Sequence, residues 1–293
     1  FPAMSNSAPL KLAQVRDLGQ VIGATFTLLR QHWRTLLRAL AFTALPVALV
    51  AGVMMGYFAG GLQRSMLGAD PDAVLGIMAG LVGPLGLGYL ALIAAYMIAI
   101  AVSYEFLRAY HLGELHLMQP GDLWKRARGQ VFNYLGLAFL VGLLTVLGTL
   151  LCVIPGIWLG IGLCLSFSVL AFERVGGTNA MRRSWELVKE HWWETFGIVV
   201  IMALIQWVVT SAIVLPFTVL SFIWGFSSGM GDMSQGLPEW YGWVMGVSSA
   251  VQYGVTILLY PLSVTAISMQ YFSLVERKES RSLEQRLEGF DAV

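Results

Sequence analysis

Charged residues are scarce in this sequence. Only 12% of its 293 residues are charged, whereas about a quarter of a soluble globular domain is. Hydrophobic residues make up 57% of the chain, and 32 residues are glycine. This composition excludes an ordinary soluble domain and is typical of a protein that crosses the membrane several times. The net charge of +1 gives no basis for a nucleic-acid partner.

Residues that bind metals are scarce as well. The two cysteines, Cys152 and Cys164, both lie in apolar runs, so we interpret them as packing residues and not as a zinc or disulfide framework. The stretch "HLGELH" (111–116) brings His111, Glu114 and His116 together, but without the spacing of a zinc helix or a fourth ligand. We expect these to be solvated loop residues. The sequence therefore predicts no metal and no cofactor.

Catalytic motifs are limited to "GFSSG" (225–229), a G-x-S-x-G pattern centred on Ser227. A serine nucleophile needs a base within hydrogen-bond reach. All four histidines are predicted on the opposite side of the membrane, about 30 Å away. We therefore expect Ser227 to be a turn residue and the protein not to be an enzyme.

Six long apolar runs predict six membrane spans. They cover residues 36–60, 80–107, 131–152, 156–172, 196–225 and 241–275. We expect Pro155-Gly156 to break the helix between the third and fourth spans, and "GLVGPLGLG" (80–88) to break the long run at 74–107. Glycines at a spacing of four predict close helix packing: Gly52/Gly56/Gly60, Gly76/Gly80 and Gly156/Gly160.

Charge is divided unequally between the two sides of these spans. Every Lys and Arg except Arg64 falls on the side that holds both chain ends, whereas the other side carries Asp70, Asp72, Asp232 and Glu239. By the positive-inside rule the basic side is cytoplasmic, so both termini are predicted to be cytoplasmic. We expect no cleavable signal peptide, and we expect the natural chain to begin at Met4.

A short phrase occurs twice, as "RQHWRTLL" (30–37) and "KEHWWETF" (189–196), each time before an apolar run. Segments 15–33 and 178–193 around it carry apolar residues at spacings of three and four, and the basic segment 121–130 precedes the third span. A basic helix of this kind with Trp lies in the plane of the lipid head groups.

The returning spans also end alike, in "SYEFL" (103–107), "SFSVL" (166–170) and "SMQYF" (268–272). We therefore predict an all-α, polytopic membrane protein with six transmembrane helices. They are arranged as three parallel two-span repeats, each preceded by a cytoplasmic interfacial amphipathic helix. The single transmembrane domain, 1–293, divides into repeats at about 10–110, 120–174 and 178–276, with 277–293 as a cytoplasmic tail.

The region 154–193 resembles a known group of membrane proteins. The matching residues are Pro155 to Trp158, Glu173, Ala180, Arg183 to Leu187, and Trp192. They are similar to the membrane domain of bacterial glycerophosphodiester phosphodiesterases and to YciC-like inner-membrane proteins. The resemblance implies a bacterial cytoplasmic (inner) membrane protein without an agreed activity. The phosphodiesterase chemistry of that group resides in a separate soluble domain, whose His-Arg-Gly motif this sequence lacks.

Three sets of residues are candidates for function. Cations beside the spans are predicted to bind lipid phosphate: Arg30, Arg34, Arg128, Arg183 and Lys189. Aromatic residues at the same depth are predicted interfacial anchors: Trp33, Trp185 and Trp192. Polar residues in or near the spans are candidates to line a cavity, or are solvated helix ends: Glu105, Arg108, Glu173, Gln206 and Gln252.

These observations favour a non-catalytic protein that binds phospholipid or a lipid-derived head group at the cytoplasmic leaflet, with membrane lipids as partners. One alternative is a transporter or channel for a small solute. The other is a scaffold that binds a protein partner through its tail, where Leu283, Leu287 and Phe290 form an apolar stripe. The sequence leaves the ligand and the oligomeric state open.

Overall fold

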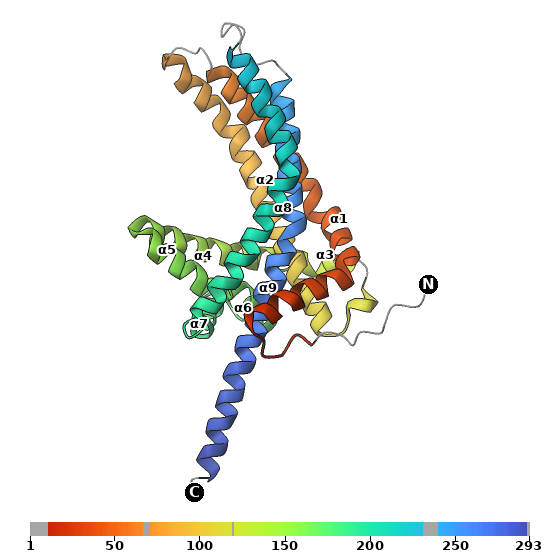
Figure 1. The fold of residues 1–293 in the computed structure, drawn as a ribbon, viewed down its shortest axis with the longest axis vertical. Helices are drawn as coiled ribbons and strands as arrows, with labels where there is room; N and C mark the ends of the chain where they lie inside the picture. Colours follow the sequence, from red (N-terminus) through yellow and green to blue (C-terminus); the bar gives the residue numbers. More distant parts are fainter. Residues whose placement is uncertain (1–10, 67–70, 119, 231–239, 292–293) are drawn as a thin grey trace. The chain divides into compact units, whose positions relative to one another are not determined.

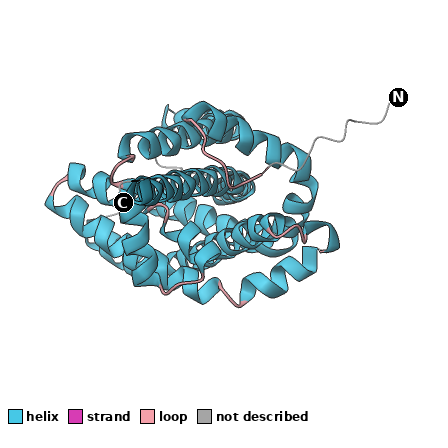
Figure 2. Ribbon diagram, turned by 90° about the horizontal axis from the view of Figure 1, so that it is seen from below, coloured by secondary structure: helices cyan, strands magenta, loops and turns pink. Residues whose placement is uncertain are grey.

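The computed structural model describes residues 11–66, 71–118, 120–230 and 240–291. Within these ranges nearly every residue is helical and none forms a strand (Figure 1; Figure 2). Four helices are long: α1 (Leu18–Met66), α2 (Pro71–His111), α8 (Trp192–Met230) and α9 (Tyr241–Asp291). The shorter ones are η1 (Leu115–Leu117), α3 (Pro120–Arg128), α4 (Val131–Leu151), α5 (Val153–Leu163), α6 (Ser166–Glu173) and α7 (Gly177–Val188).

Six helical segments in the described chain are long and apolar enough to cross a membrane, which confirms an all-helical, multi-pass membrane protein. They are Leu18–Gln63, Ala79–His111, Val131–Leu151, Val153–Glu173, Trp192–Ile223 and Tyr241–Ser280. The fourth segment joins α5 to α6 across a break at Cys164 and Leu165 that the sequence did not predict.

Two predicted helix breaks are wrong. Helix α2 runs through Pro84 without interruption. In an apolar surrounding, every backbone N–H or C=O group that loses its hydrogen bond costs several kcal/mol, so the helix keeps all the backbone hydrogen bonds that proline still permits. The break between the third and fourth spans lies at Cys152, whose backbone is extended, and not at Pro155-Gly156. Pro155 instead lies in the first turn of α5, where a missing N–H leaves no helical bond unmade.

Helix α1 is longer than the first predicted span. The segment 15–33 and the span 36–60 were expected to be separate helices, but α1 continues from Leu18 through both. No glycine or proline stands between Trp33 and Arg38 to end the helix. The segments 121–130 and 178–193 do form short separate helices, α3 and α7.

The chain forms two compact units, each built from segments that are distant in the sequence. Unit 1 consists of residues 1–36, 103–202 and 262–293, and unit 2 consists of residues 37–102 and 203–261. The helices α1, α2, α8 and α9 therefore contribute to both units. The two spans made by α4, α5 and α6 lie entirely in unit 1.

Unit 2 contains the close helix packing that glycine spacing predicted. A Cβ atom on Gly52 would lie 2.6 Å from Cα of Ala250, and one on Gly56 would collide with the backbone carbonyl of Met245. Helix α1 therefore touches α9 backbone to backbone along its glycine face. Gly156 likewise packs against Thr149 in unit 1, whereas Cβ atoms on Gly76 or Gly80 would meet no described atom within 4 Å.

Candidate functional site

Unit 1 gathers acidic and basic side chains where α2 and α6 approach their C-terminal ends. The Glu105 side chain is only 3% exposed, and it accepts a 2.8 Å hydrogen bond from Nη2 of Arg174. Nη1 of Arg108 lies 4.0 Å from the other carboxylate oxygen of Glu105. A buried carboxylate needs such compensation, because burial of an unpaired charge is very unfavourable.

Arg174 reaches Glu105 from an unusual backbone conformation. It ends α6 with φ 54° and ψ 34°, and among the described residues it alone, glycines aside, has a positive φ. This left-handed conformation disfavours residues with a Cβ atom. Helix α6 therefore ends directly after Glu173.

Glu173 forms a second polar contact in the same region. Its carboxylate accepts a 2.9 Å hydrogen bond from the Tyr271 hydroxyl on α9. Arg183 on α7 donates to the same oxygen at 3.4 Å. Glu173 thus connects α6 with α7 and α9, and Arg183, a predicted phosphate ligand, is already engaged in an ion pair.

A buried row of hydroxyl groups joins the three span ends that are alike in sequence. Tyr104 Oη lies 3.3 Å from Ser168 Oγ, which lies 3.5 Å from Ser268 Oγ. All three residues are at most 3% exposed. Polar contacts of this kind hold apolar helices in register, so α2, α6 and α9 are joined at these residues.

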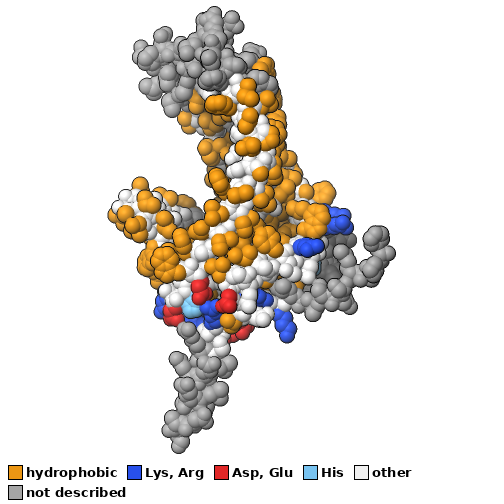
Figure 3. All heavy atoms as spheres, in the orientation of Figure 1, with side chains coloured by type: hydrophobic (Ala, Val, Ile, Leu, Met, Phe, Trp, Pro, Cys, Tyr) orange, Lys and Arg blue, Asp and Glu red, His pale blue; other side chains and the backbone are white. Residues whose placement is uncertain are grey.

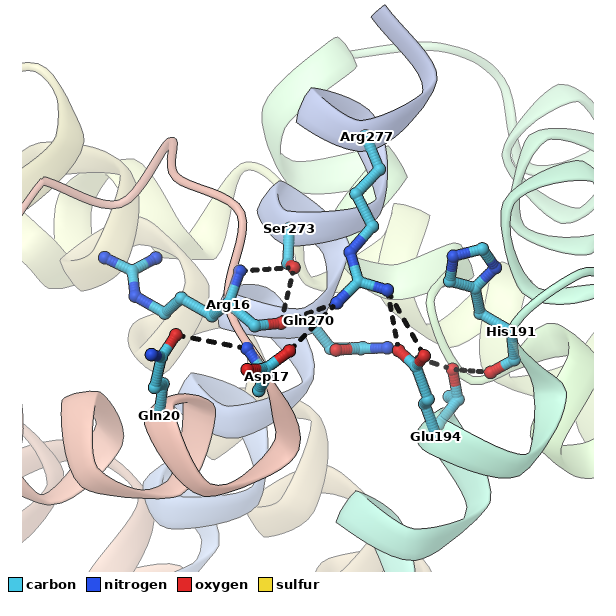
Figure 4. A network of polar contacts seen from close by, with 9 residues as sticks. Arg16, Asp17, Gln20, His191, Glu194, Gln270, Ser273 and Arg277 are labelled. Atoms are coloured by element: carbon cyan, nitrogen blue, oxygen red, sulfur yellow. Dashed lines mark hydrogen bonds and ion pairs between the residues drawn. The ribbon is translucent and has the colours of Figure 1, made fainter. Parts of the chain in front are cut away.

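Arg277 on α9 is the centre of a third set of contacts (Figure 4). Its guanidinium donates to both carboxylate oxygens of Glu194, at 3.2 and 3.0 Å, and to the backbone carbonyl of Arg16 at 2.9 Å. Asp17 lies 3.8 Å from the same guanidinium. Ser273, one turn earlier on α9, accepts from the backbone N–H of Arg16 at 2.9 Å.

Arg16 itself is 6% exposed and points away from this centre (Figure 4). Its guanidinium donates to the backbone carbonyls of Lys11, Leu12 and Gln14. Burial lowers the pKa of Arg16 from its ordinary value. The sequence indicated only that Arg16 is one of the cations on the basic side. Neither hydropathy nor residue spacing shows that the segment around Arg16 contacts α9.

Four of the five predicted phosphate ligands are exposed, and they make no ion pair within the described residues: Arg30, Arg34, Arg128 and Lys189. The guanidinium carbon of Arg34 lies 5.6 Å from the ring centroid of Trp33, which is 50% exposed. Phe26, on the same side of α1, is 44% exposed. Basic side chains lie beside hydrophobic ones over α1 (Figure 3).

The predicted anchors Trp185 and Trp192 belong to an aromatic cluster of unit 1. The Trp185 ring covers Gly162 and meets the Trp158 ring edge-on, with centroids 4.5 Å apart. Trp192 donates from Nε1 to the carbonyl of Trp158 at 3.3 Å. The prediction overlooked Trp158 and Trp193, which are 49% and 76% exposed, although their aromatic side chains were a readable signal.

The predicted cavity-lining residues are divided between the units. Glu105, Arg108 and Glu173 lie in unit 1, whereas Gln206 and Gln252 lie in unit 2. Gln206 donates to the carbonyl of Leu259 at 2.8 Å, and Gln252 is exposed.

The remaining candidates of the sequence are placed as follows. In the described chain no group of three or more His, Cys, Asp and Glu residues could hold a metal ion. The His111 ring contacts Phe272 and Phe172, with centroids 5.0 and 6.1 Å away. The side chains of His116 and Ser227, and those of the tail from 281, lie outside the described residues, as do Asp70, Asp232 and Glu239.

Comparisons with protein-family models, with curated proteins and with solved structures find no match to this chain.

Proposed function

We propose that this protein is a non-catalytic membrane protein that binds phospholipid head groups at the cytoplasmic leaflet. The observation that carries the proposal is the exposed surface of α1, defined by Phe26, Arg30, Trp33 and Arg34. It combines aromatic rings with cations that no acidic side chain of the described chain neutralises. We call it the α1 surface.

The chemistry of the α1 surface suits a lipid boundary. Tryptophan favours the head-group layer because its ring is apolar and its N–H is polar. A guanidinium donates in parallel to two phosphate oxygens, and each cation near an anionic leaflet contributes about 1 kcal/mol. Arg30 and Arg34 are four residues apart on one helix and therefore share a face.

The proposal includes the finer topology. We place the three two-span repeats in a bacterial inner membrane with both termini cytoplasmic and α3 and α7 at the interface. Helix α7 closely follows the apolar segment Val153–Glu173 and keeps Arg182 exposed, which supports an interfacial position. The resemblance of residues 154–193 to membrane domains linked with glycerophospholipid turnover supports the lipid class by analogy.

Native mass spectrometry in a mild detergent, with phosphatidylglycerol added, tests the function. Replacement of Arg30 and Arg34 by Ala is expected to weaken lipid binding about tenfold. The matched control replaces Lys125 and Arg182 by Ala, since both are exposed but already paired, with Asp122 and Glu186. If both double variants lost the same amount of lipid binding, the effect would be explained by net charge alone, and a specific role for the α1 surface would be refuted.

A scaffold function is the second candidate, and the length of α9 favours it. This helix continues to Asp291, past the charged run from Glu276 to Glu279 that follows its apolar part. Deletion of 281–293 should abolish co-purification of a protein partner and leave lipid binding intact. Loss of lipid binding in the truncated chain would argue against separate roles.

A further inference from the structure

Two guanidinium groups converge on one buried carboxylate in unit 1. Glu105 is 3% exposed, whereas Arg108 and Arg174 are 32% and 35% exposed. The carboxylate therefore lies inside the protein, and both arginines extend from it toward the surface. One acid and two bases leave one positive charge at this point.

Most side-chain N–H groups of Arg108 and Arg174 do not donate to Glu105. A guanidinium carries five N–H groups. Arg174 uses one in its 2.8 Å bond to Glu105, and Arg108, at 4.0 Å, lies beyond hydrogen-bond distance. No other side-chain bond of Arg108 or Arg174 occurs within the described residues. Both arginines can therefore donate further hydrogen bonds to a ligand at the surface while Arg174 keeps its bond to Glu105.

The backbone of Arg174 adopts a conformation that is energetically unfavourable for arginine. A left-handed conformation with φ 54° disfavours any residue with a Cβ atom, and glycine occupies such positions far more easily. Here this position holds an arginine, and its guanidinium is the one that hydrogen-bonds to Glu105. A glycine would adopt the turn more easily but could not make this bond.

We infer that Arg108 and Arg174, oriented by Glu105, form a binding site for a phosphate group. The net positive charge of two arginines and one acid is opposite in sign to that of a phosphate ester. The guanidinium N–H groups can donate to several phosphate oxygens at once. Glu105 is a positioning residue, since it is buried, holds Arg174 by a hydrogen bond and attracts Arg108 as an ion-pair partner at 4.0 Å. The site goes beyond the proposed function, because neither arginine belongs to the α1 surface.

The site lies at the end of two membrane-spanning segments. Arg108 is in the last turn of Ala79–His111, and Arg174 directly follows Val153–Glu173. A phosphate bound there comes either from a lipid head group or from a soluble phosphate ester. Both sources share the same chemistry at the two arginines.

Binding measurements on the full chain in detergent distinguish the sources. Inorganic phosphate and sn-glycerol 3-phosphate are titrated by calorimetry, and phosphatidylglycerol is added for native mass spectrometry, with diacylglycerol as the phosphate-free control. The site variants are Arg108→Gln and Arg174→Gly, the latter keeping the left-handed turn because glycine adopts it freely. The matched control is Arg182→Gln, which removes one exposed charge that is paired with Glu186.

Each site variant is expected to weaken binding of the phosphate-bearing probe about tenfold or more, and the control by less than about twofold. Binding of the lipid alone assigns a head group as ligand, and binding of the small probes assigns a soluble ester. Failure of the wild-type chain to bind any phosphate probe, unchanged binding in both site variants, or an equal loss with Arg182→Gln would overturn the inference. Size-exclusion profiles confirm that each variant is folded.

The Arg30/Arg34 double variant separates this inference from the proposed function. If it loses lipid and the site variants do not, the phosphate site is wrong and the α1 surface stands. If only the site variants lose binding, the α1 surface is wrong and the phosphate site stands.

Discussion

The guanidinium of Arg277 donates to the backbone carbonyl of Arg16 at 2.9 Å, across 261 residues of chain. Ser273 adds a hydrogen bond in each direction, since it accepts from the N–H of Arg16 and donates to its carbonyl at 3.1 Å. The segment before α1 is therefore held on α9 through its backbone, and side chains at the end of the last span decide its position.

Loss of Arg277 should release this segment. Arg277→Gln removes contacts to Glu194, Asp17 and the carbonyl of Arg16, and we expect a loss of about 1–2 kcal/mol in unfolding free energy. Hydrogen exchange at residues 11–17 should become faster. Lys278→Gln is the control, since Lys278 is half exposed and its ion-pair partner among the described residues is Glu186, at 3.9 Å. Equal exchange rates in both variants would show that Arg277 does not hold the segment.

Neutralising Glu105 should destabilise unit 1. Glu105→Gln keeps the shape of the side chain but leaves Arg174 without its buried anion, and a loss of about 1–3 kcal/mol is expected after allowance for solvent around the arginines. Thermal unfolding in detergent measures it. Glu114→Gln, which breaks the exposed pair with Arg126, should change stability by less than about 1 kcal/mol. If Glu105→Gln and Glu114→Gln had the same melting temperature, the buried carboxylate of Glu105 would contribute no more to stability than an exposed one.

Enlarging Gly56 should separate α1 from α9 in unit 2. Gly56→Leu places a side chain against the backbone carbonyl of Met245, which cannot move aside as a flexible side chain does. We expect a loss of about 3 kcal/mol or more, seen as aggregation or a lower melting temperature. A Cβ atom on Gly61 of the same helix would meet no described atom within 4 Å, so Gly61→Leu should be tolerated. Comparable losses for both would indicate that leucine in α1, and not the helix contact, is harmful.

The spans and the glycine contacts could be predicted because they depend on properties that the sequence carries directly. Hydropathy over about 20 residues decides membrane crossing, and the absence of a side chain on Gly52 permits close approach wherever a helix lies opposite. The identity of the facing helix, α9, does not follow from spacing.

Helix ends and charge partners were harder to predict. Pro84 and Pro155 are local signals whose effect depends on surroundings: one lies inside a helix and the other in a first turn. Arg34 and Arg183 look alike in the sequence, yet one is exposed and the other pairs with Glu173. Their difference arises from the folding of α7 onto α6, which no pattern in either segment records.

Helix α1 packs on α9 in unit 2 through Gly52 and Ala250, and the segment just before α1 contacts α9 in unit 1 through Arg16 and Ser273. Since a ribosome makes α1 first, this helix enters the bilayer while its partner is still unsynthesised. Its glycine face therefore remains open to lipid until α9 has been made, and any product that terminates before residue 241 keeps this face open. Backbone contact between α1 and α9 thus distinguishes a chain that contains both helices from one that contains α1 alone.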